Sequence, residues 1–100
     1  MIIEERIYTL KIGALKQYRA LYLNGARQVQ RQILGNCLGY YFTEVGTQNQ
    51  VVHLWQYDSF EERSVRRAKL MENPIFQSFM RESAHLLECQ ENRILKPLIE

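Results

Sequence analysis

A turn between two strand-like segments, followed directly by a helix start, constrains the fold of this chain more than any other feature. Residues 37–45 and 50–57 are both rich in aromatic and β-branched side chains, and residues 46–49 between them have the composition of a turn. Ser59 and Glu62 then form the capping-box pattern, in which each side chain satisfies a free backbone N–H at a helix start. This part of the chain therefore predicts an antiparallel hairpin that leads into a helix.

The other elements follow from the period of the apolar residues and from Gly and Pro. We expect a strand at 2–9, a helix from about 15 to 34, a helix from 59 to 72, a shorter helix from Pro74 and a strand at 89–95. The order βαββαβ is ferredoxin-like, and right-handed crossovers would place the helices on one face of a four-stranded antiparallel sheet. The chain is thus predicted to be one α+β domain, residues 1–100.

The hairpin also predicts which side chains share a face of the sheet. A tight turn at 46–49 would set Trp55 opposite Tyr40 and His53 opposite Phe42. The helix-facing set is then expected to be Ile3, Ile7, Tyr41, Val45, Val52 and Leu54. The other face would hold Glu4, Arg6, Tyr8, Leu38, Tyr40, Phe42, Glu44, His53, Trp55 and Tyr57. Because that face would expose a large aromatic patch, we expect a second copy to cover it in a two-fold homodimer.

Composition excludes several classes of partner and location. The chain is 46% hydrophobic and 24% charged, as in an ordinary globular protein. Its 13 Lys and Arg against 11 Asp and Glu predict neither a nucleic-acid partner nor an overall attraction to membranes. The N-terminal residues lack the pattern of a secretory signal, and no apolar run is long enough for membrane insertion, so a cytoplasmic protein with free Cys37 and Cys89 is expected.

Three segments resemble the NIPSNAP family of small dimeric α/β-barrel domains. They are E-x-R-x-Y-T-L at residues 4–10, GYYFTEVGTQNQVVHLWQYDSFEER at 39–63 and QENRILKP at 90–97. The resemblance implies a ferredoxin-like domain that pairs into a dimeric barrel, but it implies no particular reaction. Related barrels include cofactor-independent monooxygenases, haem-degrading enzymes and small-molecule-binding stress proteins, and that relation is an analogy of fold.

Candidate site residues cluster on the predicted aromatic face. His53 and Trp55 lie two residues apart on one strand, so His53 is the candidate for a catalytic proton shuttle or a ligand contact. Arg6 could anchor an anionic or quinone-like ligand, with Tyr8 as a hydrogen-bond donor. Trp55, Tyr40 and Tyr57 could stack on a flat ligand. An interface or core role is the alternative for all of these residues.

A second group is expected to form an interface or a polar network. Glu4 and Arg6 could pair across the dimer, Glu44 could join them, and Phe42 would pack in the interface. Arg93 belongs to a family-matching segment, but the pattern does not decide which face it or Asn92 occupies.

The sequence contains no phosphate-binding glycine loop, no metal-ligand spacing and no nucleophile motif, and predicts neither a metal site nor a cofactor.

The first hypothesis is a homodimeric module of unassigned biochemical function that binds a small organic ligand or acts as a structural or adaptor protein. The alternative is a cofactor-independent monooxygenase or a haem-modifying oxygenase acting on a flat aromatic substrate, and haem would be a cofactor only in that case. An adaptor could use the basic stretch Arg63, Arg66, Arg67 and Lys69, although a solvated helix face explains these residues more simply.

Overall fold

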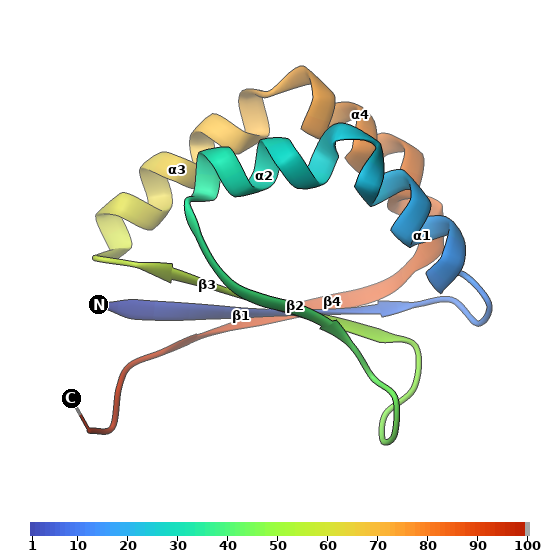
Figure 1. Ribbon diagram of the computed structural model, residues 1–100, viewed down its shortest axis with the longest axis horizontal. Coiled ribbons are helices and arrows are strands. Elements are labelled where there is room, and N and C mark those ends of the chain that lie inside the picture. The colour runs from blue at the N-terminus through green and yellow to red at the C-terminus, as the bar shows by residue number, and fades with distance from the viewer. Residues whose placement is uncertain (100) are drawn as a thin grey trace.

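The computed structural model describes residues 1–99, so residue 100 of the predicted domain lies outside the described residues. The strands are β1 (Ile2–Leu10), β2 (Asn36–Phe42), β3 (Gln50–Tyr57) and β4 (Leu87–Leu95). The helices are α1 (Leu15–Leu21), α2 (Arg27–Leu34), α3 (Phe60–Glu72) and α4 (Pro74–Ser83), with short helical turns at Tyr22–Ala26 and Ala84–Leu86. The sheet has the order β2-β3-β1-β4 with every neighbouring pair antiparallel, and all helices lie on one side of it (Figure 1). The predicted ferredoxin-like α+β fold is confirmed.

The predicted start signals of the last two long helices are both used. Ser59 caps α3, because its Oγ accepts a hydrogen bond of 3.1 Å from the backbone N–H of Glu62. The Glu62 carboxylate accepts in turn from the N–H of Asp58, one residue earlier than a strict capping box requires. Pro74 is the first residue of α4, and the Asn73 side chain caps that helix. These local patterns determine where the chain changes direction.

The single helix predicted for residues 15–34 is wrong in one respect, because it is bent in the middle. The backbone leaves helical angles at Asn24 and Gly25, where Gly25 has φ of +96°. A side chain there would be strained, and its Cβ would lie 3.3 Å from a methyl group of Ile75 on α4. Because of this bend, α1 and α2 run in different directions over the sheet (Figure 1).

The predicted register of the hairpin is also wrong, by two residues. Tyr40 pairs with His53 and Phe42 pairs with Val51, and β2 ends at Phe42 rather than at residue 45. The connection is a loop at 43–49, which is longer than the predicted four-residue turn. Asn49, its last residue, has a φ of +63°. Because side chains alternate with a period of two, this shift leaves Tyr40, Tyr41 and Phe42 on the same faces as their predicted neighbours. The register shifts again between Cys37 and Gly39, so the prediction for Leu38 is wrong: this residue has no partner on β3 and is exposed instead of sharing the face of Tyr40.

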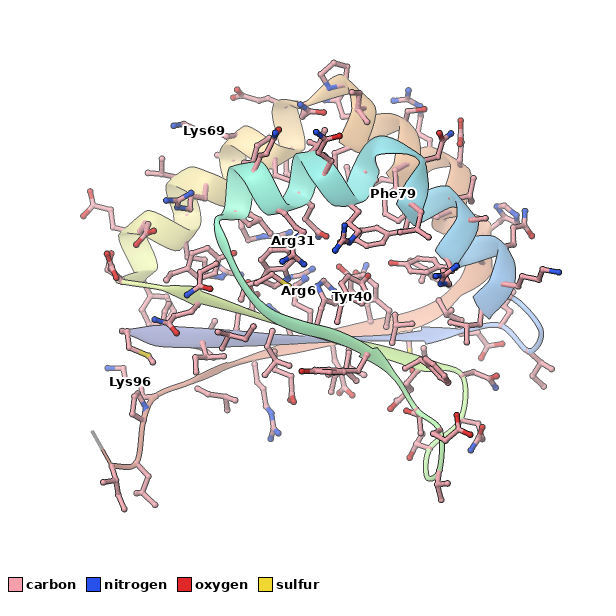
Figure 2. The ribbon with its side chains drawn as sticks, in the orientation of Figure 1. Arg6, Arg31, Tyr40, Lys69, Phe79 and Lys96 are labelled. Atoms are coloured by element: carbon pink, nitrogen blue, oxygen red, sulfur yellow. The ribbon has the colours of Figure 1, made fainter. Side chains whose placement is uncertain are left out.

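The assignment of the two faces to the helices and to the outside is inverted. The helices cover the face that carries Glu4, Arg6, Tyr8, Tyr40, His53, Trp55 and Tyr57, and Figure 2 shows Arg6 and Tyr40 in the layer beneath the helices. The open face carries Ile3, Ile7, Tyr41, Val52 and Leu54, while Val45 lies in the loop and is exposed. The helix stripes are rich in aromatic residues such as Tyr18, Tyr22 and Phe79, and aromatic side chains bury the largest apolar area on contact.

Two predicted features concern the chain as a whole. No helix within residues 1–99 is long and apolar enough to cross a bilayer. Cys37 and Cys89 are separate thiols, and they lie on β2 and β4, the two opposite edges of the sheet.

Candidate functional site

A cavity of about 370 Å³ lies between the sheet and the helices. Its polar lining comes mainly from the sheet side and α3, and its apolar lining comes mainly from α4. The lining residues are Arg6, Tyr8, Tyr18, Gln30, Tyr40, Arg67, Met71, Phe76, Phe79, Met80, Ser83, Ala84, Leu87 and Gln90. The alternation of β1 directs Arg6 and Tyr8 to the helix side, together with Glu4, so the cavity opens beside a buried polar row.

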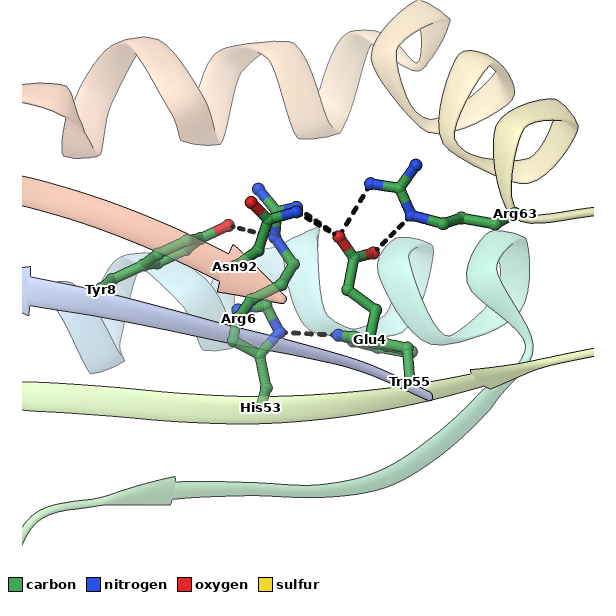
Figure 3. Close-up of polar contacts among 7 residues, drawn as sticks. All are labelled: Glu4, Arg6, Tyr8, His53, Trp55, Arg63 and Asn92. Carbon is green, nitrogen blue, oxygen red and sulfur yellow. Dashed lines mark hydrogen bonds and ion pairs between the residues drawn. The ribbon is translucent and has the colours of Figure 1, made fainter. Parts of the chain in front are cut away.

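Glu4 is the centre of that row, and its side chain is fully buried. Arg63 donates two hydrogen bonds to its carboxylate, Nε to Oε1 at 3.0 Å and Nη2 to Oε2 at 2.8 Å. Oε2 also accepts from Arg6 Nη1 at 3.0 Å and from Asn92 Nδ2 at 2.7 Å (Figure 3). Burial alone would raise the pKa of Glu4, but the hydrogen bonds from Arg63 and Asn92 and the charge of Arg6 outweigh burial and lower it to about 2. Glu4 is therefore an anion at any physiological pH.

Arg6 links the Glu4 cluster to the cavity. Its Nη1 donates to Glu4, and its Nε donates to the Tyr8 hydroxyl at 3.0 Å. Burial would lower the pKa of the guanidinium, but the neighbouring Tyr8 and Glu4 raise it above its ordinary value. Arg6 is thus a fixed cation whose orientation is set from two sides.

Arg67 reaches the same cavity from α3, one helical turn after Arg63. Unlike Arg63, it forms no ion pair with any of the described residues, 1–99. Burial, together with the positive charge of Arg6, lowers the pKa of its guanidinium. Arg67 is a partly buried cation at the cavity wall without a counter-ion in the described part of the chain.

His53 lies beneath the cavity lining rather than in it. The indole N–H of Trp55 donates to His53 Nδ1 at 2.6 Å, so the neutral ring carries its proton on Nε2. The Tyr40 ring stacks on the imidazole with centroids 4.3 Å apart, and the Tyr8 ring contacts its edge. Burial and the charge of Arg6 lower the pKa of His53 to about 3. His53 is therefore a neutral imidazole at neutral pH, and its buried Nε2 has no hydrogen-bond partner among residues 1–99.

The remaining wall of the cavity is aromatic and hydrogen-bonded. The hydroxyls of Tyr18 and Tyr40 lie 3.1 Å apart, which ties α1 to β2. Behind this wall, the hydroxyl of Tyr22 donates to Oε1 of Gln30, and Gln30 lines the cavity. Burial raises the pKa of Tyr18, Tyr22 and Tyr40, so all three keep their protons at neutral pH.

The structure separates the predicted ligand-binding residues into two groups. Arg6, Tyr8 and Tyr40 line the cavity, whereas His53, Trp55 and Tyr57 are buried and do not. Burial raises the pKa of the Tyr57 phenol to about 12, and its hydroxyl has no partner among residues 1–99.

Only some of the residues predicted to form an interface or a polar network belong to the network around Glu4. Asn92 joins Glu4 on the helix side, whereas Arg93 lies on the open face and pairs with Glu5 at 2.6 Å. Phe42 lies half-exposed beside α1, outside the cavity, and Glu44 is exposed in the loop.

Sequence reasoning missed the contributions of α3. Arg63 and Arg67 were assigned to a solvated basic face, but they share a helical stripe with Leu70, which is fully buried. The spacing of four and three residues to a leucine was the signal that these arginines face inward. Within residues 1–99 no group of three or more His, Cys, Asp or Glu side chains is placed to hold a metal ion.

Comparison with known proteins gives one consistent family. The family model described as NIPSNAP matches residues 3–99. The protein NipSnap homolog of Dictyostelium discoideum is 30% identical over 95 residues, which are 95% of this chain and 42% of that protein. The chain therefore spans less than half the length of that relative.

Solved structures extend this comparison. A NIPSNAP family protein from Agrobacterium tumefaciens is 42% identical, with a TM-score of 0.92 over 96% of this chain and 91% of that chain. An antibiotic biosynthesis monooxygenase is 13% identical, with a TM-score of 0.65 over 99% of this chain and 100% of that chain. At that identity the second comparison shows a shared fold alone.

Proposed function

The chain belongs to the NIPSNAP family, and from that premise we propose that it is a binding module for a small organic molecule, which it holds between its sheet and its helices. The observation that carries the proposal is the cavity lined by Arg6, Tyr8 and Tyr40 on one side and by α4 on the other. The biochemical role of such a module would be to retain, carry or present its ligand.

The size and lining of the cavity support a ligand rather than a packing defect. Protein interiors leave few voids larger than a water molecule. A volume of about 370 Å³ lies at the lower end of the range of roughly 300–1,000 Å³ in which small-molecule sites fall. The wall combines a broad apolar surface with a few polar groups in fixed positions, which is the usual composition of such sites.

The geometry favours ligand binding over docking through the basic stretch of α3. Arg63 is bonded to Glu4, and Arg67 lines the cavity. Arg66 donates to Glu62 at 2.9 Å and to the carbonyl of Ile33 at 3.0 Å. The stretch is therefore divided among internal contacts instead of presenting one charged surface to a partner.

The geometry also favours binding over the oxygenase alternative. That alternative assigns proton transfer or haem ligation to His53. Its Nδ1 already accepts from Trp55, its Nε2 is fully buried, and neither atom lies at the cavity wall. A haem ligand needs an accessible nitrogen, and a proton relay works best with a pKa near neutrality, so His53 as placed fits neither role.

We propose further that the working unit is a homodimer in which a second copy covers the open face of the sheet. Support comes from the row of Ile3, Ile7, Val52 and Leu54, which are only partly buried although each is apolar. Tyr41 adds an aromatic ring that is 58% exposed on the same face. An apolar face of this kind is typical of an interface between identical subunits.

Native mass spectrometry of freshly purified protein tests both parts of this proposal. We expect a dimer that carries additional mass from a bound small molecule. A bare dimer would still allow added ligands, so the second measurement is titration with the neutral fluorescent probe N-phenyl-1-naphthylamine. A bare monomer that fails to bind the probe would overturn both parts.

A cavity-filling variant shows where the probe binds. Ala84→Phe places a ring at the cavity wall and should weaken probe binding about tenfold or more, because it removes apolar contact area. Ala68→Phe is the matched control, since Ala68 is exposed on α3 and does not line the cavity. Equal binding by the wild type and Ala84→Phe would place the probe elsewhere and contradict the proposal.

A further inference from the structure

Arg67 lines the cavity together with Arg6, and among the described residues, 1–99, it has no ion-pair partner. We propose that the ligand of the cavity is an amphipathic organic anion, with a carboxylate or sulfonate-like head group held by Arg67 and Arg6 and an apolar or aromatic body packed against α4. This inference names the ligand class of the binding function proposed above and rests on it.

The charges of the arginines at and beside the cavity are not balanced by carboxylates. Glu4 is the carboxylate that pairs with Arg6 and Arg63, through ion pairs of 3.0 and 2.8 Å. Arg67 adds another guanidinium that lines the same cavity as Arg6, and the charge of Arg6 helps to lower its pKa. Arg6 and Arg63 thus share one carboxylate and Arg67 has none among residues 1–99, and an anionic ligand would relieve that imbalance.

Free donors point to hydrogen bonding as well as to charge. Arg6 uses Nη1 and Nε for Glu4 and Tyr8, while its Nη2 donates to none of the described residues. The Arg67 guanidinium likewise makes no hydrogen bond within residues 1–99 and lines the cavity together with Arg6. A carboxylate matches guanidinium donors in geometry and in charge, and such charge-assisted bonds are stronger than neutral ones.

The phenols beside the arginines would add to the same head-group site. The Tyr8 hydroxyl accepts from Arg6 Nε at 3.0 Å, and as a hydroxyl group it can donate as well as accept. Tyr18 and Tyr40 are neutral phenols at neutral pH, as burial raises the pKa of both further, and one of the two hydroxyls donates to the other at 3.1 Å. The hydroxyl proton of this pair that is not used between the two rings is therefore available to an anion.

The apolar side of the cavity indicates the chemistry of the ligand body that would lie beyond the head group. Met71, Phe76, Phe79, Met80 and Leu87 form an apolar surface along one side of the cavity. An inorganic anion at the arginines would leave this surface in contact with water, whereas an apolar body would bury it. Methionine side chains adapt to irregular shapes, which suits a surface that holds an aromatic or branched group.

Two matched probes test the charge of the ligand. The first is 1-anilinonaphthalene-8-sulfonate, and the second is N-phenyl-1-naphthylamine, which has nearly the same rings without the anionic group. We expect the wild type to bind the anionic probe about tenfold more tightly, the difference produced by one charge-assisted interaction. Equal affinities would overturn the inference, while binding of the neutral probe that is lost in Ala84→Phe would leave the proposed binding function intact.

Arg67→Met tests the residue itself. Its affinity for the anionic probe should fall about tenfold and its affinity for the neutral probe should not change. Arg81→Met is the matched control, because Arg81 is exposed on α4, makes no ion pair within residues 1–99 and does not line the cavity. An unchanged affinity for the anionic probe in folded Arg67→Met would contradict the assignment.

A competition experiment on the wild type makes the test independent of any variant. 1-Naphthoate should displace N-phenyl-1-naphthylamine at roughly a tenth of the concentration required for the neutral 1-naphthamide. Displacement by inorganic phosphate at the same concentration as 1-naphthoate would contradict the apolar body of the ligand. If neither probe binds and no bound mass is found, the binding function fails together with its ligand class.

Discussion

The helix-covered face of the sheet is more polar than the open face, which is the reverse of what a simple layered domain would have. The helix-covered face buries a carboxylate, a guanidinium and an imidazole, at Glu4, Arg6 and His53, whereas the open face carries aliphatic side chains such as Val52 and Leu54. Burial of a charged group is tolerated where hydrogen bonds satisfy it, and the Glu4 carboxylate accepts four. His53 is instead buried as a neutral imidazole. The comparison shows that apolar content alone does not decide which face of a sheet becomes the core.

Aromatic area explains the rest of the difference. Trp55, Tyr57 and Tyr40 lie in the core on the covered face, where Tyr40 contacts Tyr18 of α1 and Tyr22 of the following turn. These side chains bury more apolar surface than valine or isoleucine, so the covered face gains more from contact with the helices although it is also the more polar face. The open face is left with an apolar row that a second copy can cover.

The largest expected effect comes from neutralising Glu4 on the covered face, and the comparison is with its neighbour Glu5 on the open face. Glu4→Gln should lower the free energy of unfolding by about 3–5 kcal/mol, because Arg6 and Arg63 would remain buried without a counter-ion. Glu5→Gln is the matched change on the open face, where its partner Arg93 is 67% exposed, and it should cost less than about 1 kcal/mol. Urea unfolding measures both, and similar losses would contradict the assignment of the faces.

The next effect is a loss of stability in mild acid. His53 has a pKa of about 3 in the folded protein against an ordinary value of 6.5, so below pH 6.5 the unfolded chain binds a proton that the folded chain does not. Stability should therefore fall by about 2 kcal/mol between pH 7 and pH 5, before Glu4 begins to contribute below its ordinary value of 4.5.

Two histidine variants check this assignment. His53→Gln should show almost no loss of stability between pH 7 and pH 5. The matched control His85→Gln, at an exposed position, should keep the wild-type profile. Unfolding midpoints across this pH range decide the matter, and a wild-type profile in His53→Gln would assign the acid sensitivity to other groups.

A smaller effect distinguishes adjacent valines. Val51 is buried beneath the helices and Val52 lies on the open face. Val51→Ala should lower the free energy of unfolding by about 1.5 kcal/mol at any protein concentration, because it removes buried methyl groups from the core. Val52→Ala should destabilise by less, and its effect should grow with protein concentration if a second copy covers this face. Unfolding at two concentrations tests this difference, and two concentration-independent losses would weaken the dimer proposal.

The smallest effect comes from adjacent tyrosines. Tyr40→Phe removes the hydroxyl that lies 3.1 Å from that of Tyr18 and should cost about 1 kcal/mol. Tyr41→Phe changes an exposed side chain on the open face and should have little effect on the free energy of folding. Thermal unfolding with both variants in one buffer resolves the difference, and a larger loss in Tyr41→Phe would imply an unrecognised contact.

Local signals predicted the boundaries of the elements well. Ser59 begins α3, Pro74 begins α4, and Gly35 follows the end of α2 with a φ of +92°. These residues act on the backbone within a few positions of themselves, so one sequence is enough to recognise them. The bend at Gly25 was missed because an isolated glycine in an apolar helical pattern does not distinguish a bend from a continuous helix.

The candidate site was predicted only in part. Arg6, Tyr8 and Tyr40 were correctly grouped on one face, since strand alternation holds whichever side the helices take. His53 appeared equally suited to a cavity, but its position beneath Tyr40 depends on packing across the sheet and against the helices. Arg67 was missed because its role depends on facing Arg6 from another layer.

The sequence by itself determined the order of the elements, most of their boundaries and the sets of side chains that share a face, because these depend on neighbours in the chain and on the period of the backbone. Only the tertiary structure decided which set the helices cover and which cation remains without a counter-ion. The physical reason is distance along the chain, since Glu4 takes its partners Arg63 and Asn92 from 59 and 88 positions away. Which of several arginines meets a buried carboxylate is settled when the layers pack, and no local pattern encodes that choice.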